Sequence, residues 1–384
     1  MLVDLHAHFP MHLLPEAQRR THSRVDTWSR RRWQALVVSL ISRVVNYQGP
    51  GDTPSVTETL MREGDVGVAL SVLYAPFDEM DLGKSYGAPP AGGYFADILA
   101  ELELVEEHAS AHPDEVAIAH SPAELDALMG DSRPILIHCI EGGFQLGEDE
   151  AAVRANVQAL ADRGVAYVTV AHLFWRRVAT SAPALPFLPD WLYHKVFPQP
   201  DEGLTALGRT AVEAMIDNGI LVDVTHMSEH ARADTLALLD QRDPRQEVPV
   251  IATHMACRFG KLEYCLPDDS VRRIAKRGGV MGCILCKHYI SDGLSQPVRS
   301  YEESLGALFR HIDRIHDLTG SFDNVAVGSD LDGYIKPALP GLEHMGLMRT
   351  FQRSLQERYG AADAEKISSG NALRVLRSAW RRTV

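Results

Sequence analysis

Short apolar runs bounded by turn-forming residues alternate along the 384-residue chain with segments of helical periodicity. The apolar runs are typical of buried strands and lie near residues 2–6, 67–74, 134–140, 165–171, 220–225, 248–253, 279–285 and 324–329. The helical segments lie near residues 33–46, 97–110, 150–162, 205–217, 229–240, 269–277, 302–317 and 343–358. Eight alternations of strand and helix predict a parallel (β/α)8 barrel, the TIM-barrel fold, rather than a doubly wound sheet.

Glycines mark the ends of three predicted helices. Gly164, Gly219 and Gly278 each stand between a helical segment and the next strand, where a left-handed cap costs glycine little. Residues 363–380 predict one extra C-terminal helix packed on the barrel, and a short extra strand is possible near 116–119. With no repeat or linker in the pattern, we expect residues 1–384 to form a single catalytic domain.

Metal-binding side chains follow five of the apolar runs. In a parallel barrel all strand ends of one polarity meet at the same mouth, so residues far apart in the sequence converge there. Two histidines separated by one residue point to the same side, because side chains alternate along a strand. The residues at these strand ends are His6, His8, Glu141, His226, His254 and Asp330.

This set of ligands indicates the kind of metal and the number of ions. Imidazole and carboxylate without thiolate suit Zn²⁺ better than Mn²⁺, Co²⁺ or Fe²⁺. Six side chains exceed the three that one catalytic zinc usually takes, so we expect two ions per chain, with Glu141 as the bridge. Two ions would activate a water and stabilise an oxyanion, while Asp330 would carry a proton to the leaving group.

Several segments together resemble the membrane (renal) dipeptidase family of zinc dipeptidases, within the amidohydrolase-like superfamily. They are IEGG (140–143), DVTH (223–226), PVIATHMACR (249–258), GSDLDG (328–333) and GNALRVL (370–376), with GLTALG (203–208) in addition. The resemblance runs in order from residue 4 to about residue 376. It implies hydrolysis of the peptide bond of dipeptides, including those with a C-terminal D-residue, and two zinc ions per chain.

The resemblance also implies roles for particular residues. His172, after the fourth strand, matches the histidine that holds the scissile carbonyl and its oxyanion, and Asp330 matches the catalytic acid/base. Arg258 matches the residue that pairs with the terminal carboxylate of the substrate, a group that a guanidinium can bind bidentately. The metal ligands would be His6, His8, Glu141 as the bridge, His226 and His254.

The chain departs from the family at His8, where HxD is usual. The HxH pattern is instead that of the wider amidohydrolase superfamily, and it removes one negative charge from the site. Three consequences of this change stay open: weaker binding of the first zinc ion, a lower pKa of the bridging water, or membership of a branch that uses another metal or substrate. The segment HLFWRR, which begins at His172, also lacks the polar residues that follow this histidine in the family, so substrate specificity is the property least determined by the sequence.

Charge and composition narrow the choice of partners and location. A net charge of −13 argues against nucleic acid or an anionic membrane as the main partner. No basic segment with an apolar core precedes the first strand, so we expect a cytoplasmic protein. The resemblance suggests a homodimer. Two long segments at the predicted mouth, residues 75–96 and the aromatic, proline-rich residues 173–203, are expected to be loops that wall the substrate or form a subunit contact.

Two other functions stay open. The HxH pattern and the aromatic loop would also suit a hydrolase acting on a cyclic amide, a lactone or an N-acyl amino acid. A metal-binding or assembly protein that has lost catalysis is the non-enzyme alternative, and the presence of Asp330 and His172 argues against it.

Overall fold

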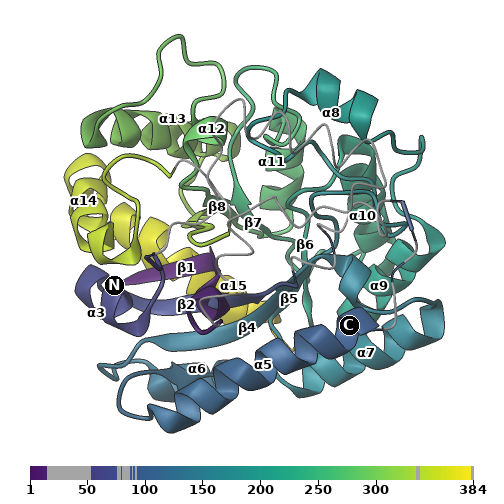
Figure 1. Cartoon of the computed structure of the whole chain (residues 1–384). Helices are drawn as coiled ribbons and strands as arrows, with labels where there is room; N and C mark the ends of the chain where they lie inside the picture. Colours follow the sequence, from purple (N-terminus) through teal and green to yellow (C-terminus); the bar gives the residue numbers. More distant parts are fainter. Residues whose placement is uncertain are drawn as a thin grey trace.

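The predicted strands form one parallel sheet that is nearly closed into a barrel (Figure 1). The computed structural model describes residues 1–14, 53–75, 79, 87–88, 90, 93–333 and 338–381. The barrel strands are β1 (Leu2–Ala7), β2 (Val66–Leu73), β4 (Ile135–Glu141), β5 (Tyr167–Thr169), β6 (Leu221–Asp223), β7 (Ala252–Met255), β8 (Met281–Cys283) and β9 (Val325–Val327).

Neighbouring strands follow the order β6-β5-β4-β2-β1-β9-β8-β7. A parallel bridge between Asp223 and Ile251 joins the two ends of this order, so β6 and the residues just before β7 close the ring. The possible extra strand exists as β3 (Ala117–Ile118), which pairs with β4. The (β/α)8 prediction is therefore confirmed.

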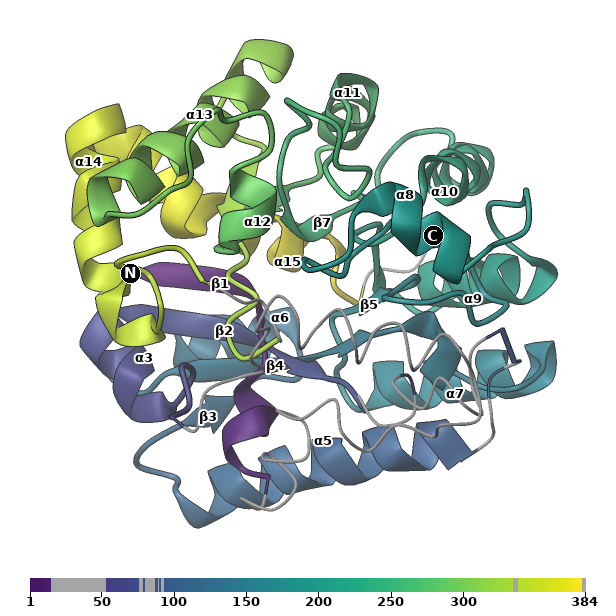
Figure 2. The ribbon, with the colours of Figure 1, turned by 45° about the horizontal axis from the view of Figure 1, so that its top comes forward.

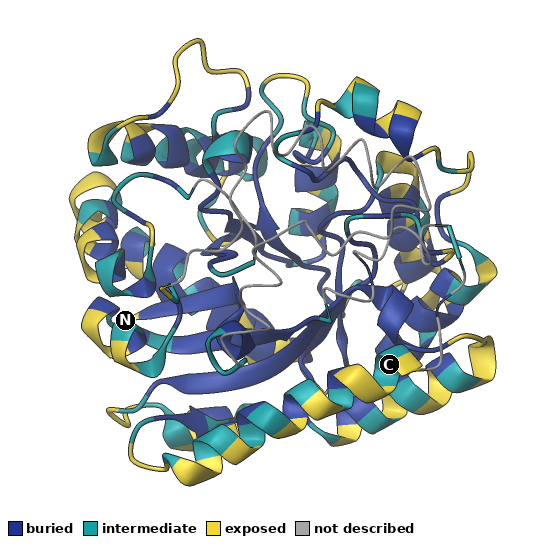
Figure 3. Ribbon diagram, viewed as in Figure 1, coloured by how far each residue is buried: buried dark blue, intermediate teal, exposed yellow. Residues whose placement is uncertain are grey.

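Helices surround the barrel (Figure 2). Their inner faces are buried together with the strands, whereas their outer faces are exposed, as on α5 and α7 (Figure 3). The helices are α3 (Glu58–Gly64), α5 (Gly93–Ala111), α6 (Pro122–Leu128), α7 (Glu150–Asp162), α8 (Asp190–Val196), α9 (Ala206–Asp217), α10 (Glu229–Arg242), α11 (Asp268–Lys276), α12 (Lys287–Ile290), α13 (Tyr301–Thr319), α14 (Met348–Glu365) and α15 (Asn371–Ala379). None of the described helices is long and apolar enough to cross a membrane.

Local signals in the sequence set the limits of these helices. A Ser, Thr or Asp side chain accepts a backbone N–H at the start of α3, α6, α7, α9, α10 and α13. Gly164, Gly219 and Gly278 have φ of 75°, 67° and 67°, as the sequence predicts. Gly360, with φ 77° and ψ 167°, interrupts α14 between the two helices predicted at 343–358 and 363–380.

Two expectations need correction, and others lie outside the described residues. Strand β7 begins at Ala252, later than the predicted 248–253: Pro249 has no N–H to donate, and Ile251 forms only an isolated bridge to Asp223. The segment 173–203 is not simply loop: it contains α8, which packs in an apolar cluster with Phe174 and Phe197. The helix predicted at 33–46 and most of the loop at 75–96 lie outside the described residues.

A buried histidine of α13, His311, packs against α12 and is expected to make the stability of the fold depend on pH. His311 accepts the Cys257 N–H at Nδ1 (2.9 Å), so its Nε2–H donates to the Ile290 carbonyl (2.9 Å). Burial lowers the pKa of His311 to about 4, helped by nearby Arg310 and opposed by Asp292. The unfolded chain therefore takes up this proton first, and the contribution of His311 to stability falls as the pH drops from about 6.5 to 4.

We expect this loss to be about 3 kcal/mol. The difference in unfolding free energy between the wild type and His311→Gln should shrink by that amount between pH 7 and pH 4. Urea titrations at several pH values measure it. A difference that stays constant with pH would show that His311 is not held neutral.

Candidate metal centre

All the predicted ligands and catalytic groups except Arg258 meet at the C-terminal mouth of the barrel. Each lies within the last two residues of a strand or within three residues after it, and none is more than 7% exposed. Because the strands are parallel, their C-terminal ends place these side chains at one edge of the barrel, as the sequence pattern predicts. The residues are His6, His8, Glu141, His172, His226, His254 and Asp330.

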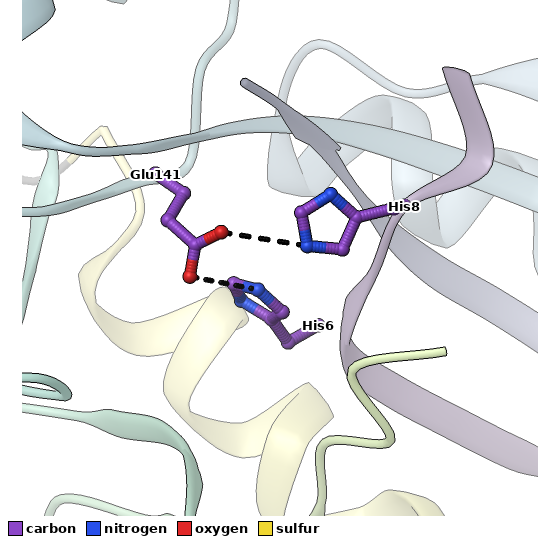
Figure 4. A group of neighbouring side chains, drawn as sticks. All are labelled: His6, His8 and Glu141. Atoms are coloured by element: carbon purple, nitrogen blue, oxygen red, sulfur yellow. Dashed lines mark ion pairs between the residues drawn. The ribbon is translucent and has the colours of Figure 1, made fainter. Parts of the chain in front are cut away.

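The Glu141 carboxylate, at the end of β4, lies at the centre of the cluster. Its Oε1 is 3.3 Å from His6 Nε2, 3.4 Å from His226 Nε2 and 3.4 Å from His254 Nε2. Figure 4 shows His6 and His8 pointing at the two oxygens of this carboxylate. Burial opposes ionisation of Glu141, but the surrounding imidazoles hold its pKa well below the usual range. Glu141 is therefore an anion placed among imidazoles that belong to several strands.

The second oxygen of Glu141 faces a different pair of imidazoles. Its Oε2 is 3.4 Å from His8 Nε2 and 3.4 Å from His172 Nε2. His8 Nε2 is also 3.3 Å from Asp330 Oδ1. Burial lowers the pKa of His8, but Asp330 and Glu141 outweigh it and raise this pKa to about 10. The histidine that replaces the expected aspartate thus interacts with both carboxylates.

The polar atoms at the centre fit a divalent cation. Within the described part of the chain, His6 Nε2, His8 Nε2 and Glu141 Oε1 are buried and make no hydrogen bond. His226 Nε2 and His254 Nε2 face each other at 2.9 Å, and burial lowers the pKa of both imidazoles, which favours their neutral forms. Buried polar atoms without partners cost roughly 1–3 kcal/mol each, and a metal ion shared by these side chains removes that cost.

Hydrogen bonds behind the cluster orient two of the imidazoles. The Tyr167 hydroxyl donates to the Leu5 carbonyl (3.0 Å), so at 2.7 Å it accepts the Nδ1–H of His6. Thr253 Oγ1 donates to the Asp223 carboxylate (2.7 Å) and, at 3.0 Å, accepts the Nδ1–H of His254. Both histidines therefore present the lone pair of Nε2 to the centre, the tautomer that a metal ligand needs.

Asp330 and His226 adopt backbone conformations that are costly for side-chain-bearing residues. Their φ values are 56° and 64°, in the left-handed region. The Asp330 N–H donates to the His6 carbonyl at 2.8 Å, which ties the turn after β9 to β1. Burial raises the pKa of Asp330. A carboxyl with a raised pKa at a reaction centre can accept a proton and release it again.

His172 has a buried carboxylate behind it that sequence reasoning missed. Its Nδ1 lies 2.5 Å from Glu79 Oε2, and Glu79 also accepts the Tyr74 hydroxyl (2.8 Å) and the Phe174 N–H (3.1 Å). Burial opposes protonation of His172, but Glu141 and Glu79 outweigh it and raise its pKa. Glu79 belongs to a segment expected to be loop, and no periodicity marks it.

Replacing this carboxylate should weaken catalysis through His172. We expect Glu79→Gln to lower kcat by about 10- to 100-fold, and to lower the pH at which the histidine loses its proton. The pH profile of kcat measures both effects.

Glu101→Gln is the matched control, because Glu101 is another carboxylate that accepts a backbone N–H of Tyr74 (2.7 Å) without contacting His172. Burial raises the pKa of Glu101 to about 8, so the amide resembles its neutral form. Equal losses in the two variants would show that Glu79 has only a structural role.

Arg258 is held by its own loop rather than pointing into the cluster. Its Nε donates to the carbonyls of Leu262 and Cys265 at 3.1 Å, and its Nη2 donates to the Glu263 carbonyl at 2.9 Å. The remaining Nη1 pairs with Glu229, the first residue of α10. Binding of a substrate carboxylate by Arg258 stays a prediction.

A parallel barrel with five imidazoles and two carboxylates at its mouth has the architecture of barrel hydrolases that use divalent metals. The chain belongs to the family described as membrane dipeptidase (peptidase family M19), which it matches over residues 1–382. This membership confirms the resemblance seen in the strand-end motifs.

Relatives and solved structures agree with this membership. Dipeptidase 3 of Rattus norvegicus is 24% identical over 324 residues, which cover 83% of this chain and 57% of that protein. The chain thus spans less than two thirds of that relative's length. Two solved structures share the fold over 99% of both chains with TM-scores of 0.72: dipeptidase AC, a family M19 metallopeptidase (19% identical), and a Rhodobacter sphaeroides metallopeptidase liganded with a phosphinate mimic of L-Ala-D-Ala (20% identical).

Proposed function

We propose that the protein is a metal-dependent dipeptidase that hydrolyses the peptide bond of dipeptides, including those with a C-terminal D-residue. The convergence of the strand-end imidazoles on Glu141, with Asp330 and His172 beside them, carries this proposal. Membership of family M19 supports it, and the L-Ala-D-Ala mimic in the Rhodobacter sphaeroides structure supports the substrate class.

We propose two zinc ions per chain, held by the imidazoles on either side of the Glu141 carboxylate. The ligands would be His6, His8, Glu141, His226 and His254. A divalent cation bound there acts as a Lewis acid that activates water and polarises the scissile carbonyl.

The chain's own residues would supply the proton transfers and the positioning. Asp330, buried and with a raised pKa, takes a proton from the attacking water and delivers it to the leaving amine. His172, held by Glu79, donates from Nε2 to the oxyanion that develops on the carbonyl. Burial of both groups keeps bulk water from competing for these hydrogen bonds.

Arg258 is our candidate for the terminal carboxylate of the substrate. Its Nη1 pairs with Glu229, whose side chain is 58% exposed. A substrate carboxylate would therefore replace the Glu229 carboxylate as the partner of Nη1. Such an exchange keeps the guanidinium paired throughout, and it would act on KM more than on kcat.

A panel of substrates with metal analysis tests the proposal. Purified protein loaded with Zn²⁺ is assayed on L,L and L,D dipeptides, N-acyl amino acids and lactones, and its zinc content is measured. We expect turnover of dipeptides and about two zinc ions bound by the Glu141 cluster of each chain. Turnover of only the N-acyl amino acids or lactones would favour the alternative hydrolase over the dipeptidase. No turnover of any substrate at full metal loading would contradict both functions.

A cytoplasmic location and a homodimer are also part of the proposal. Cell fractionation and light scattering of the purified protein test them separately from the activity.

A further inference from the structure

A second group of imidazole and carboxylate side chains lies away from the Glu141 cluster, where three elements meet. His12 is the last residue of the short 3-10 helix η1 (Phe9–His12), Glu58 is the first residue of α3, and His108 lies in the last turn of α5. Figure 2 shows η1 next to α5. His12 Nε2 is 3.5 Å from Glu58 Oε2, and His108 Nε2 is 3.9 Å from Glu58 Oε1.

The atoms that face one another in this group have no hydrogen-bond partner. Among the described residues, His12 Nε2, Glu58 Oε2 and His108 Nε2 are all buried and make no hydrogen bond. Three such atoms in one place are costly unless something binds them, because each has given up its water without a replacement.

The hydrogen bonding of His12 and the charge of Glu58 suit metal binding. His12 Nδ1 lies 2.6 Å from the Phe9 carbonyl and must donate to it, so its Nε2 carries the lone pair in the neutral imidazole. The neighbouring His12 imidazole, helped by that of His108, lowers the pKa of Glu58 to about 2. An anionic carboxylate and the Nε2 atoms of two imidazoles therefore face one another.

We propose that His12, Glu58 and His108 bind one divalent transition-metal ion, for which Zn²⁺ is the best match. Two imidazoles and a carboxylate form a common zinc ligand set, with bond lengths of about 2.0–2.2 Å. The three ligand atoms lie within 4.8 Å of one another, so small side-chain movements close them around one ion.

The ion would join parts of the chain that are distant in the sequence. It would tie η1, which begins directly after the ligand His8, to α3 and α5 across the first part of the barrel. The role of this ion would be structural. None of its three ligands belongs to the metal centre at the barrel mouth. The competing description is a pair of histidine–carboxylate ion pairs without a metal.

Zinc counting with variants tests the proposal independently of activity. Protein stripped with a chelator is reloaded with Zn²⁺, passed through gel filtration and analysed for zinc per chain. His108→Ala and Glu58→Gln should each bind about one zinc ion fewer than the wild type, with turnover retained. His112→Ala is the matched control: His112 directly follows α5, with its ring centroid 4.4 Å from that of His108, and should keep the wild-type zinc content.

Crystals grown with Zn²⁺ provide a second readout that needs no variant. An anomalous peak between His12 and His108 is expected in the wild type. Equal zinc content in the wild type and both variants, or no anomalous peak there when the barrel mouth is fully loaded, would overturn the proposal. Failure of the dipeptidase assignment would appear only as absent turnover and would leave this zinc count unchanged.

Discussion

Asp330→Asn is expected to lower kcat by about 10³-fold while fold and zinc content stay unchanged. Asparagine keeps the shape of the side chain but cannot accept and release the proton that passes from water to the leaving amine. It also tolerates the left-handed backbone at φ 56°, so the turn after β9 should survive the change. Steady-state kinetics on the best dipeptide, with zinc analysis of the same sample, gives the measurement.

Asp332→Asn provides the matched control for this variant. Asp332 also has a left-handed backbone, with φ 63°, but its carboxylate accepts the backbone N–H groups of Ser55 and Val56. Its loss should reduce stability and leave kcat within a small factor of the wild type. Wild-type turnover by Asp330→Asn would instead remove Asp330 from the mechanism and favour the non-catalytic alternative.

Glu141→Gln is expected to weaken zinc binding by at least about 100-fold and to abolish turnover at ordinary zinc concentrations. The amide keeps the volume of the side chain but removes the negative charge that faces five imidazoles through its two oxygens. Competition with a zinc-binding dye measures the affinity.

Assays at high zinc concentrations distinguish two causes of inactivity in Glu141→Gln, namely loss of metal affinity and loss of a catalytic role. Restored turnover at saturating zinc would show that Glu141 serves metal affinity alone, whereas inactivity of the fully loaded variant would show a further role in catalysis. Glu101→Gln again serves as the control, since it makes the same Glu-to-Gln change at a partly buried side chain outside the cluster. Unchanged zinc affinity in Glu141→Gln would contradict its role as the central ligand.

Much of the metal centre could be predicted because its ligands follow a local rule. Each ligand comes at the end of an apolar run, and parallel strands bring such ends to one mouth whatever the length of chain between them. Helix limits were equally local: capping side chains and the glycines with positive φ lie next to the residues that they affect.

Other parts of the site depend on contacts that no local pattern encodes. Glu79 reaches His172 across 93 residues, and Tyr167 reaches His6 across 161. Arg258 has the chemistry to bind a carboxylate, but the path of its loop brings three carbonyls and Glu229 to its guanidinium. Such partners are set by the path of the chain in space.

The sequence by itself determined the (β/α)8 barrel, the family and the residues that gather at the mouth, because periodicity and strand ends are local properties. Only the tertiary structure decided which oxygen of Glu141 faces which imidazole, which tautomers His6 and His254 adopt, and that His12, Glu58 and His108 meet. Those features depend on distances of a few ångströms between segments far apart in the chain, and such distances are fixed only when the whole barrel packs.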